Sequence, residues 1–304
     1  MSISHFRGSD VPTSSLAEIP VKVTSQSLKD KKLSGIPITA LTAYDYATAR
    51  MVDEAGIDLI LVGDSLAMVV MGYESTLPVT VDEMLHHTKA VRRAVKRAMV
   101  VADMPYGSYH TDMAQGIANA VRFIKEGGAE AVKIEGGANR VELMERLADA
   151  EIPVVGHLGL TPQSVHRMGG YKVQGKSITA IEKLTKDALS LERAGVVAVV
   201  LEGIPREAAQ HITSELSVPT IGIGAGPDTD GQILVLHDLV NLTFSPQAKF
   251  VRQYADASEL FRNAFAAYRR DVEARTFPDE KESYHLTKET RAVLETTLVA
   301  RRKA

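Results

Sequence analysis

The sequence of 304 residues contains no cysteine. This absence excludes disulfide bonds, zinc sites with thiolate ligands and a cysteine nucleophile. It is compatible with a reducing compartment, and we expect a cytoplasmic protein. An excess of basic residues is also lacking, because the formal net charge is −3. The chain therefore has no global positive charge for binding nucleic acid or an anionic membrane.

Long hydrophobic runs are lacking as well. No apolar segment approaches the roughly 20 residues that a membrane-spanning helix needs. The first residues, MSISHFRGSDVPTSS, lack the apolar stretch of a secretory signal. We therefore expect a soluble protein without membrane or nucleic-acid partners. Apolar residues still make up 45% of the chain, which is enough for a full core.

Apolar segments that resemble strands alternate with amphipathic segments that resemble helices. Strands are predicted at residues 37–44, 58–64, 98–107, 129–137, 152–160, 196–205, 218–226 and 233–240. Helices are predicted at residues 25–35, 46–56, 80–98, 112–128, 141–151, 177–195, 206–216 and about 256–273.

The predicted strands are continuous runs of Val, Ile, Leu and Ala, which are typical of parallel strands that are covered on both faces. Eight such βα repeats favour a (β/α)8 TIM barrel. The alternative is an open, doubly wound sheet, but no GxGxxG motif follows the first strand. We expect an N-terminal arm with a short helix (1–35), a catalytic barrel (36–275) and a charged C-terminal tail (276–304). The tail is interpreted either as a surface or intersubunit helix or as disordered chain.

Polar side chains occur where the predicted strands end, and in a barrel these ends meet at one mouth. The residues concerned are Asp64, Ser65, Asp103, Lys133, Glu135, His157 and Glu202. Three carboxylates, those of Asp64, Asp103 and Glu135, would repel one another unless a cation lies among them. Ligands that are all oxygen suit a hard ion, above all Mg²⁺. Each acid could instead be a helix N-cap or part of a salt bridge in a loop.

The other polar residues at the strand ends suggest further roles. Lys133 lies two residues before Glu135, so both side chains point the same way, and Lys133 could neutralise a substrate carboxylate or oxyanion. It could also pair with a neighbouring acid or form a Schiff base. Glu202 follows an apolar strand, which suits a general base, although an ion pair with an arginine is the alternative. His157 could position a substrate oxygen or be a satisfied core histidine.

Three further signals are weaker. The GIGAG segment (222–226) could bind an anion through backbone N–H groups, but a tight turn after a strand is the simpler explanation. The loop at 71–80 could form a lid or a rim over the mouth. The pairs His86-His87 and Arg92-Arg93 lie on a predicted helix and are interpreted as a solvated face.

Several long segments, in the same order, closely resemble the ketopantoate hydroxymethyltransferase family. The likeness extends roughly from Pro37 to His285. The segments are ITALTAYD, LVGDSLAMVVMGYESTLPVTVDEM, VADMPYGSY, AVKIEGG, VVGHLGLTPQSVHRMGGYKVQGK, LEGIP and IGIGAGPDTDGQILVLHDL. The resemblance implies a barrel of the phosphoenolpyruvate mutase and isocitrate lyase type. It also implies a homo-oligomer, a decamer of stacked pentameric rings.

The resemblance implies transfer of a one-carbon unit from 5,10-methylenetetrahydrofolate to 3-methyl-2-oxobutanoate, which gives 2-dehydropantoate on the pantothenate route. Mg²⁺ would chelate the keto acid and stabilise an enolate, without a redox group. By motif, the metal ligands are Asp64, Asp103 and Glu135, the substrate contacts are Asp64, Ser65, Asp103 and Lys133, and the proton acceptor is Glu202. The LEGIP segment has Gly203 where some relatives have cysteine, which leaves Glu202 in place.

Two other functions fit parts of the pattern. A metal-dependent lyase of the isocitrate lyase type would share the acids at the barrel mouth. Such lyases usually carry a catalytic cysteine, and this chain has none. A barrel that has lost catalysis and serves as a binding protein is the second alternative, and the presence of all three acids, Lys133 and Glu202 argues against it.

Overall fold

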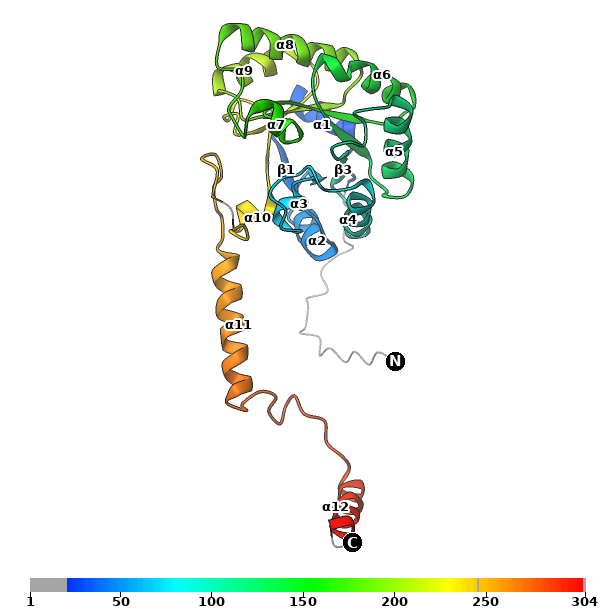
Figure 1. The fold of residues 1–304 in the computed structure, drawn as a ribbon, viewed down its shortest axis with the longest axis vertical. Coiled ribbons are helices and arrows are strands. Elements are labelled where there is room, and N and C mark those ends of the chain that lie inside the picture. Colours follow the sequence, from blue (N-terminus) through cyan, green and yellow to red (C-terminus); the bar gives the residue numbers. More distant parts are fainter. Residues whose placement is uncertain (1–20, 245, 303–304) are drawn as a thin grey trace. The chain divides into compact units, whose positions relative to one another are not determined.

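The computed structural model describes residues 21–244 and 246–302. Eight parallel strands form one closed barrel in sequence order, which confirms the expected fold class (Figure 1). The strands are β1 (Ile38–Thr42), β2 (Leu59–Val62), β3 (Met99–Asp103), β4 (Ala131–Glu135), β5 (Val154–Gly159), β6 (Ala198–Glu202), β7 (Thr220–Ile223) and β8 (Gly231–Leu234). The first and last strands close the ring, with Ile38 beside Gly231 and Leu41 beside Leu234.

The continuous apolar runs are explained by two separate cores. Side chains that alternate along a strand point to opposite faces of the sheet. In β2, Leu59 and Leu61 belong to the cluster that fills the barrel, while Ile60 and Val62 pack in the larger cluster with the outer helices. Both faces are therefore buried, as the sequence predicted.

The outer layer consists of helices that each bury one apolar face. The long helices of this layer are α2 (Tyr46–Glu54), α4 (Val81–Ala94), α5 (Met113–Lys125), α6 (Val141–Asp149), α8 (Ile178–Arg193) and α9 (Arg206–Glu215). In α4, Thr80 and Glu83 form a capping box, and Met84, Leu85 and Val91 are buried. Short elements that the sequence did not predict are α3 (Leu66–Val69), α7 (Val165–Met168), α10 (Leu236–Leu239), η1 (Ala138–Arg140) and η2 (Pro162–Ser164).

The eighth strand was predicted at the wrong place. It covers Gly231–Leu234, whereas the sequence predicted residues 233–240, and α10 occupies the rest of that segment. The register with β1 and β7 fixes the strand at Gly231. The Leu236 N–H then donates to the Thr42 hydroxyl (2.9 Å), where the chain turns into α10.

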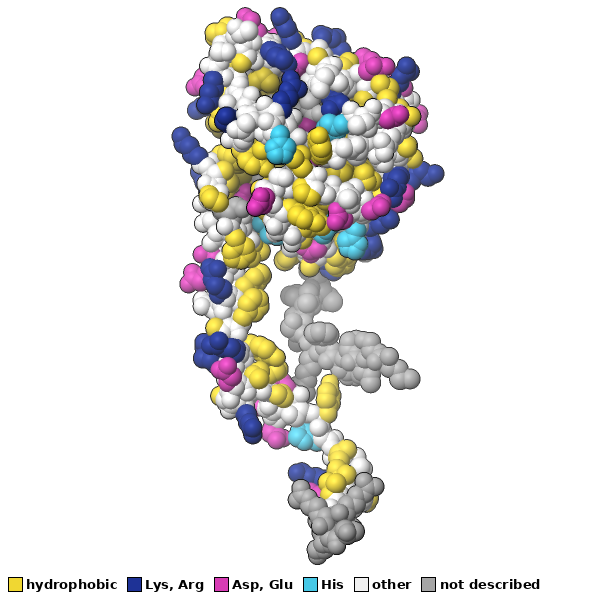
Figure 2. Space-filling view, viewed as in Figure 1, with side chains coloured by type: hydrophobic (Ala, Val, Ile, Leu, Met, Phe, Trp, Pro, Cys, Tyr) yellow, Lys and Arg dark blue, Asp and Glu magenta, His cyan; other side chains and the backbone are white. Residues whose placement is uncertain are grey.

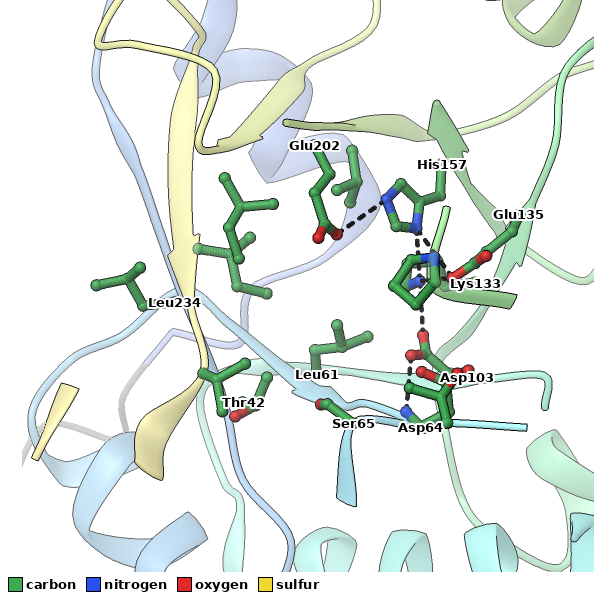
Figure 3. A pocket seen from close by; sticks show the side chains of 16 residues that line it. Thr42, Leu61, Asp64, Ser65, Asp103, Lys133, Glu135, His157, Glu202 and Leu234 are labelled. Atoms are coloured by element: carbon green, nitrogen blue, oxygen red, sulfur yellow. Dashed lines mark hydrogen bonds and ion pairs between the residues drawn. The ribbon is translucent and has the colours of Figure 1, made fainter. Parts of the chain in front are cut away.

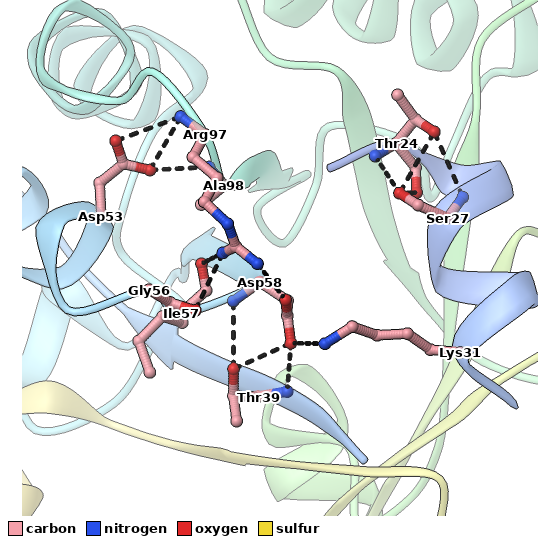
Figure 4. A network of polar contacts seen from close by, with 10 residues as sticks. All are labelled: Thr24, Ser27, Lys31, Thr39, Asp53, Gly56, Ile57, Asp58, Arg97 and Ala98. Atoms are coloured by element: carbon pink, nitrogen blue, oxygen red, sulfur yellow. Dashed lines mark hydrogen bonds and ion pairs between the residues drawn. The ribbon is translucent and has the colours of Figure 1, made fainter. Parts of the chain in front are cut away.

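Helix α1 (Ser25–Leu33) lies at the end of the barrel where the strands begin, as its contacts show. Its Leu28 is fully buried in the interior cluster. Its Lys31 donates to Asp58, which precedes β2, and its Lys32 donates to Asp230, which precedes β8. Figure 4 shows Asp58 held between Lys31 and Arg97. Helix α1 therefore covers the barrel at the end where the strands begin.

A second compact unit comprises residues 240–242 and the chain from residue 253 onward. It contains α11 (Ala257–Glu273) and α12 (Lys288–Arg302), so α11, which the sequence boundary at 275 assigned to the barrel, lies in this unit. One side of α11 carries exposed apolar side chains (Figure 2): Leu260, Phe261, Phe265, Tyr268 and Val272.

The N-terminal arm was predicted to span residues 1–35. Its first 20 residues lie outside the described part of the chain, and its short helix is α1. The charged tail was predicted at 276–304, and α12 is the helical part of it. No helix within residues 21–244 and 246–302 is long and apolar enough to span a membrane.

Candidate active site

A cavity of about 110 Å³ lies at the carboxyl ends of the strands, and it is lined by all seven polar residues that the sequence analysis placed at the strand ends (Figure 3). They continue the inward-facing rows of the barrel. Met99 and Val101 fill the interior, and Asp103 is the next inward residue of β3. Lys133 and Glu135 follow Ala131 in the same way on β4. The alternation of a strand therefore carries these groups into the cavity.

Each of the three carboxylates accepts a hydrogen bond on one of its oxygens. The Asp64 N–H donates to Asp103 Oδ2 (2.9 Å), and the amide of Gln163 donates to Asp64 Oδ2 (2.8 Å). The backbone N–H of Gln163 donates to Glu135 Oε2 (3.0 Å). The other oxygens of two acids, Asp103 Oδ1 and Glu135 Oε1, are buried and accept no hydrogen bond from any described residue.

Lys133 lies among these acids. Its Nζ is 3.2 Å from Asp103 Oδ1 and 3.9 Å from Glu135 Oε1. Burial by itself lowers the pKa of Lys133, but the charges of Asp103, Glu135 and Asp64 outweigh burial and raise that pKa. Lys133 is therefore an ammonium ion paired with acids inside the barrel. A Schiff-base role, which needs a neutral amine, does not fit this environment.

His157 connects the acidic cluster with Glu202. Its Nε2 lies 3.2 Å from Glu202 Oε2, and its Nδ1 lies 3.4 Å from Glu135 Oε1. Burial and Lys133 lower the pKa of His157, but the contacts with Glu135 and Glu202 raise it to about 9. Lys133 Nζ is 3.0 Å from the same Nδ1, which could accept from it only in a neutral ring. The raised pKa favours the charged ring, because both nitrogens face carboxylates.

The carboxylates of the site outnumber its cationic groups, so a bound cation would bring its charge closer to neutral. Four carboxylates, those of Asp64, Asp103, Glu135 and Glu202, face two cationic groups, Lys133 and His157. Burial first, and then the charges of Asp103 and Glu135, raise the pKa of Asp64 well above its usual range. Burial also raises the pKa of Asp103. A positive charge near these acids would relieve both effects.

The donor chemistry of the cluster fits Mg²⁺, since it offers carboxylate oxygens, two of which are buried and accept no hydrogen bond within the described part of the chain. The side chains of the described residues nevertheless form no ready group of three His, Asp or Glu ligands around one point. Lys133 Nζ lies beside Asp103 Oδ1 and Glu135 Oε1, the two buried oxygens that accept no hydrogen bond from a described residue. Binding of an ion would thus require Lys133 or the carboxylates to shift.

Further residues contact the side chains of the cavity or line it, and the sequence analysis selected only the loop that carries one of them. Tyr44 is buried and its hydroxyl lies 2.8 Å from the Ser65 hydroxyl. Thr76, from the loop at 71–80, lines the cavity with a buried hydroxyl that has no partner among the described residues. Gln163 and Tyr109 lie behind the acids. The only sequence signal for Gln163 is its place four residues after β5.

The weaker sequence signals have structural explanations. In the GIGAG segment, Gly224 and Gly226 have φ values of +60° and +79°, as a tight turn requires. On α4, the ring of His87 is not simply solvated, because its Nδ1 lies 2.6 Å from the carbonyl oxygen of Tyr44.

Comparisons with a family profile and with individual proteins indicate the same family. The sequence profile of the ketopantoate hydroxymethyltransferase family matches residues 22–280. A Koribacter versatilis protein named 3-methyl-2-oxobutanoate hydroxymethyltransferase is 69% identical over 274 residues, which are 90% of this chain and 93% of that protein. A Thermoanaerobacter protein of the same name is 57% identical over 267 residues, 88% of this chain and 97% of its own length.

Solved structures resemble the fold at low sequence identity. Phosphonopyruvate hydrolase, in a complex with oxalate and Mg²⁺, has a TM-score of 0.59 at 14% identity and covers 91% of this chain and 97% of its own. The 2,3-dimethylmalate lyase of the PEP mutase/isocitrate lyase superfamily has a TM-score of 0.53 at 16% identity, covering 94% of this chain and 100% of its own. These likenesses confirm the barrel type expected from the sequence.

Proposed function

Because the chain belongs to the ketopantoate hydroxymethyltransferase family, we propose that it transfers a one-carbon unit from 5,10-methylenetetrahydrofolate to 3-methyl-2-oxobutanoate. The acceptor and the hydroxymethyl transfer are those that the names of its relatives state. The product would be 2-dehydropantoate. The observation that carries the proposal is the meeting of Asp64, Asp103, Glu135, Lys133 and Glu202 in one cavity.

Asp64, Asp103 and Glu135 would hold a Mg²⁺ ion. Their oxygen donors suit a hard cation, and the raised pKa of Asp64, caused by burial and by the neighbouring carboxylates, indicates a need for positive charge. Bound Mg²⁺ supplies Lewis acidity that polarises the ketone of the keto acid and makes the hydrogen at C3 more acidic.

Lys133 would neutralise the anionic acceptor. The keto acid carries one carboxylate, and negative charge develops on its ketone oxygen when the C3 proton leaves. An ammonium group that is already buried and fixed stabilises this charge without reorganising. Lys133 meets that condition, because it is 4% exposed and held between Asp103 and Glu135.

Glu202 would remove the C3 proton. It ends β6, lines the cavity, and projects into it from a strand other than those that carry the acidic cluster (Figure 3). His157 contacts one of its oxygens at 3.2 Å and so orients the carboxylate. The carbon freed of its proton then forms a bond to the methylene carbon of the folate. Both C–N bonds of that methylene group break, water supplies the hydroxyl of the new hydroxymethyl group, and the C3 proton and one proton of the water pass to the two nitrogens of the tetrahydrofolate that leaves. A general base of this kind contributes about 10²- to 10⁴-fold in rate.

The lyase alternative shares the barrel but lacks support at the site. The structures that resemble this chain include lyases and hydrolases at 14–16% identity, which shows the fold alone. The chain contains no cysteine that could act as a catalytic acid.

One assay tests the proposed reaction. The purified protein is given 3-methyl-2-oxobutanoate, 5,10-methylenetetrahydrofolate and Mg²⁺, and 2-dehydropantoate is measured by mass spectrometry. We expect product only when all three are present, and loss of product when EDTA removes the metal. Product that still forms without the folate would contradict its assignment as the one-carbon donor. Product that still forms in EDTA would contradict the requirement for a metal.

The proposal extends to assembly and location. A homo-oligomer, expected to be a decamer, is supported by the exposed apolar side chains of α11, because such a stripe is typical of a helix that packs against a partner. Light scattering of the purified protein gives its mass directly, and a monomer would contradict this part of the proposal. A cytoplasmic location stays a prediction.

A further inference from the structure

Gln163 contacts two of the three acids of the cluster at once. Its side-chain amide donates to Asp64 Oδ2 at 2.8 Å and to the carbonyl oxygen of Met104 at 3.0 Å. Its backbone N–H donates to Glu135 Oε2 at 3.0 Å. Asp64 follows β2 and Glu135 ends β4, so one residue of η2 joins groups from two separate strands.

Tyr109 fixes Gln163 from behind. Its hydroxyl donates to Gln163 Oε1 at 2.6 Å and accepts from the Glu135 N–H at 3.1 Å. Both side chains are buried, with exposed fractions of 5% for Gln163 and 3% for Tyr109. The two amide hydrogens and the amide oxygen of Gln163 are therefore all used, and the network admits one orientation of the amide.

These bonds leave each contacted acid with one bound oxygen. Gln163 binds Oδ2 of Asp64 and Oε2 of Glu135, while Glu135 Oε1 has no hydrogen-bond partner in the described part of the chain. Groups that bind one carboxylate oxygen and aim the other at a metal are common behind metal ligands, and their loss typically weakens metal binding by 10- to 100-fold.

We propose that Gln163 is the positioning residue of the acidic cluster, and that Tyr109 holds it in the orientation that aims Asp64 and Glu135 at a divalent cation. This inference rests on the metal assignment of the proposed function. Gln163 itself does not touch the substrate or the ion. It acts through the two carboxylates. A hydrophobic residue at this position would keep the backbone N–H that donates to Glu135 but would lose the side-chain amide that donates to Asp64.

The test compares Gln163→Met with the wild-type chain. Methionine has a similar length and fills the space but donates no hydrogen bond, while the backbone N–H to Glu135 remains. The matched control is Gln26→Met on α1, where the side-chain amide of an exposed glutamine donates to Asp30 of the same helix. Mg²⁺ binding to metal-free protein is measured by titration calorimetry, and folding is measured by thermal melting.

We expect the dissociation constant for Mg²⁺ to rise about 10- to 100-fold in Gln163→Met and to stay unchanged in Gln26→Met. Tyr109→Phe, which removes the hydroxyl between Gln163 and Glu135, should weaken Mg²⁺ binding in the same direction, and it decides the question if Gln163→Met does not fold. Because both changes act through one network, their effects should not add in the double variant.

Two outcomes overturn the inference, and they differ from each other. The first outcome is that Gln163→Met folds and binds Mg²⁺ as tightly as the wild-type chain does. If Gln163→Met does not fold, the same result with Tyr109→Phe counts instead. In either case Gln163 is only a packing residue, and the metal assignment stands. If the wild-type chain itself binds no Mg²⁺, the metal assignment fails and the role of Gln163 fails with it.

Discussion

The buried carboxylate of Asp58 offers a sharp test of how the end of the barrel that α1 covers is stabilised (Figure 4). Its side chain is 2% exposed, and it accepts hydrogen bonds from Lys31 Nζ (2.6 Å) and from an Arg97 guanidinium nitrogen (2.8 Å). The backbone N–H and the hydroxyl of Thr39 also donate to it, both at 3.0 Å. Asp58→Asn keeps the size of the side chain but removes its charge.

The expected loss follows from the two charge-assisted hydrogen bonds. Such bonds contribute roughly 1.5 to 3 kcal/mol each. The side chains of Lys31 and Arg97 are 26% and 27% exposed, so water can hydrate both cations when the carboxylate is lost. We therefore use the lower end of this range for each bond. We expect the free energy of unfolding to fall by about 3 kcal/mol, measured by urea unfolding followed by circular dichroism.

The pH dependence gives a second measurement on the same variant. Burial alone raises the pKa of Asp58, but the hydrogen bonds from Lys31, Thr39 and Arg97 outweigh burial and lower it. A lowered pKa stabilises the fold above the unfolded-state pKa of about 3.9, and this stabilisation disappears as the pH falls through the folded-state pKa. The difference between wild type and Asp58→Asn should therefore be constant between about pH 7 and 5 and shrink below about pH 4.

The matched control is Asp82→Asn. Asp82 also accepts from an arginine at 2.8 Å, but its side chain is 80% exposed, so we expect a change of at most about 1 kcal/mol. If Asp58→Asn costs less than the control, or if its effect does not depend on pH below about 4, the reasoning from burial and charge is wrong.

Three further predictions concern the cavity. Glu202→Gln should slow deuterium exchange at C3 of 3-methyl-2-oxobutanoate by about 10²- to 10⁴-fold while keto-acid binding persists, and wild-type exchange by NMR would remove Glu202 from the base role. Asp64→Ala should weaken Mg²⁺-dependent keto-acid binding at least about tenfold by calorimetry, and unchanged binding would count against the metal assignment. At Gly159, where φ is +94°, an added Cβ would lie 2.2 Å from the carbonyl oxygen of Glu202. Gly159→Ala should therefore destabilise the fold by about 3 kcal/mol or more in urea unfolding and displace the end of β6; full stability would show that the strand ends are not packed as described.

Much of the barrel could be predicted because its strands are buried on both faces. Residues such as Leu59 to Val62 are apolar at every position, and this pattern needs no tertiary information to be recognised. The eighth strand was misplaced because ILVLHDLV fits a strand and a short helix equally well. Only the pairing of Gly231 to Leu234 with β1 decides between the two.

The candidate site could be predicted in part for a related reason. Asp64, Asp103 and Glu202 follow or end apolar strands, and parallel strands bring such ends together. Gln163 and Tyr109 were missed because an amide and a phenol in loop segments carry no chemical signal of their own. Their importance comes from contacts with residues that are far away in the sequence.

The sequence by itself determined the order of strands and helices, the inward row that places Lys133 and Glu135 on one face, and the likeness to a family of hydroxymethyltransferases. These properties are local, since they depend on side-chain type and on the twofold repeat of a strand. The tertiary structure alone decided that His157 lies between Glu135 and Glu202 and that Gln163 joins Asp64 to Glu135. Distances between side chains on different strands depend on the closure of the barrel, and no local pattern of residues encodes them.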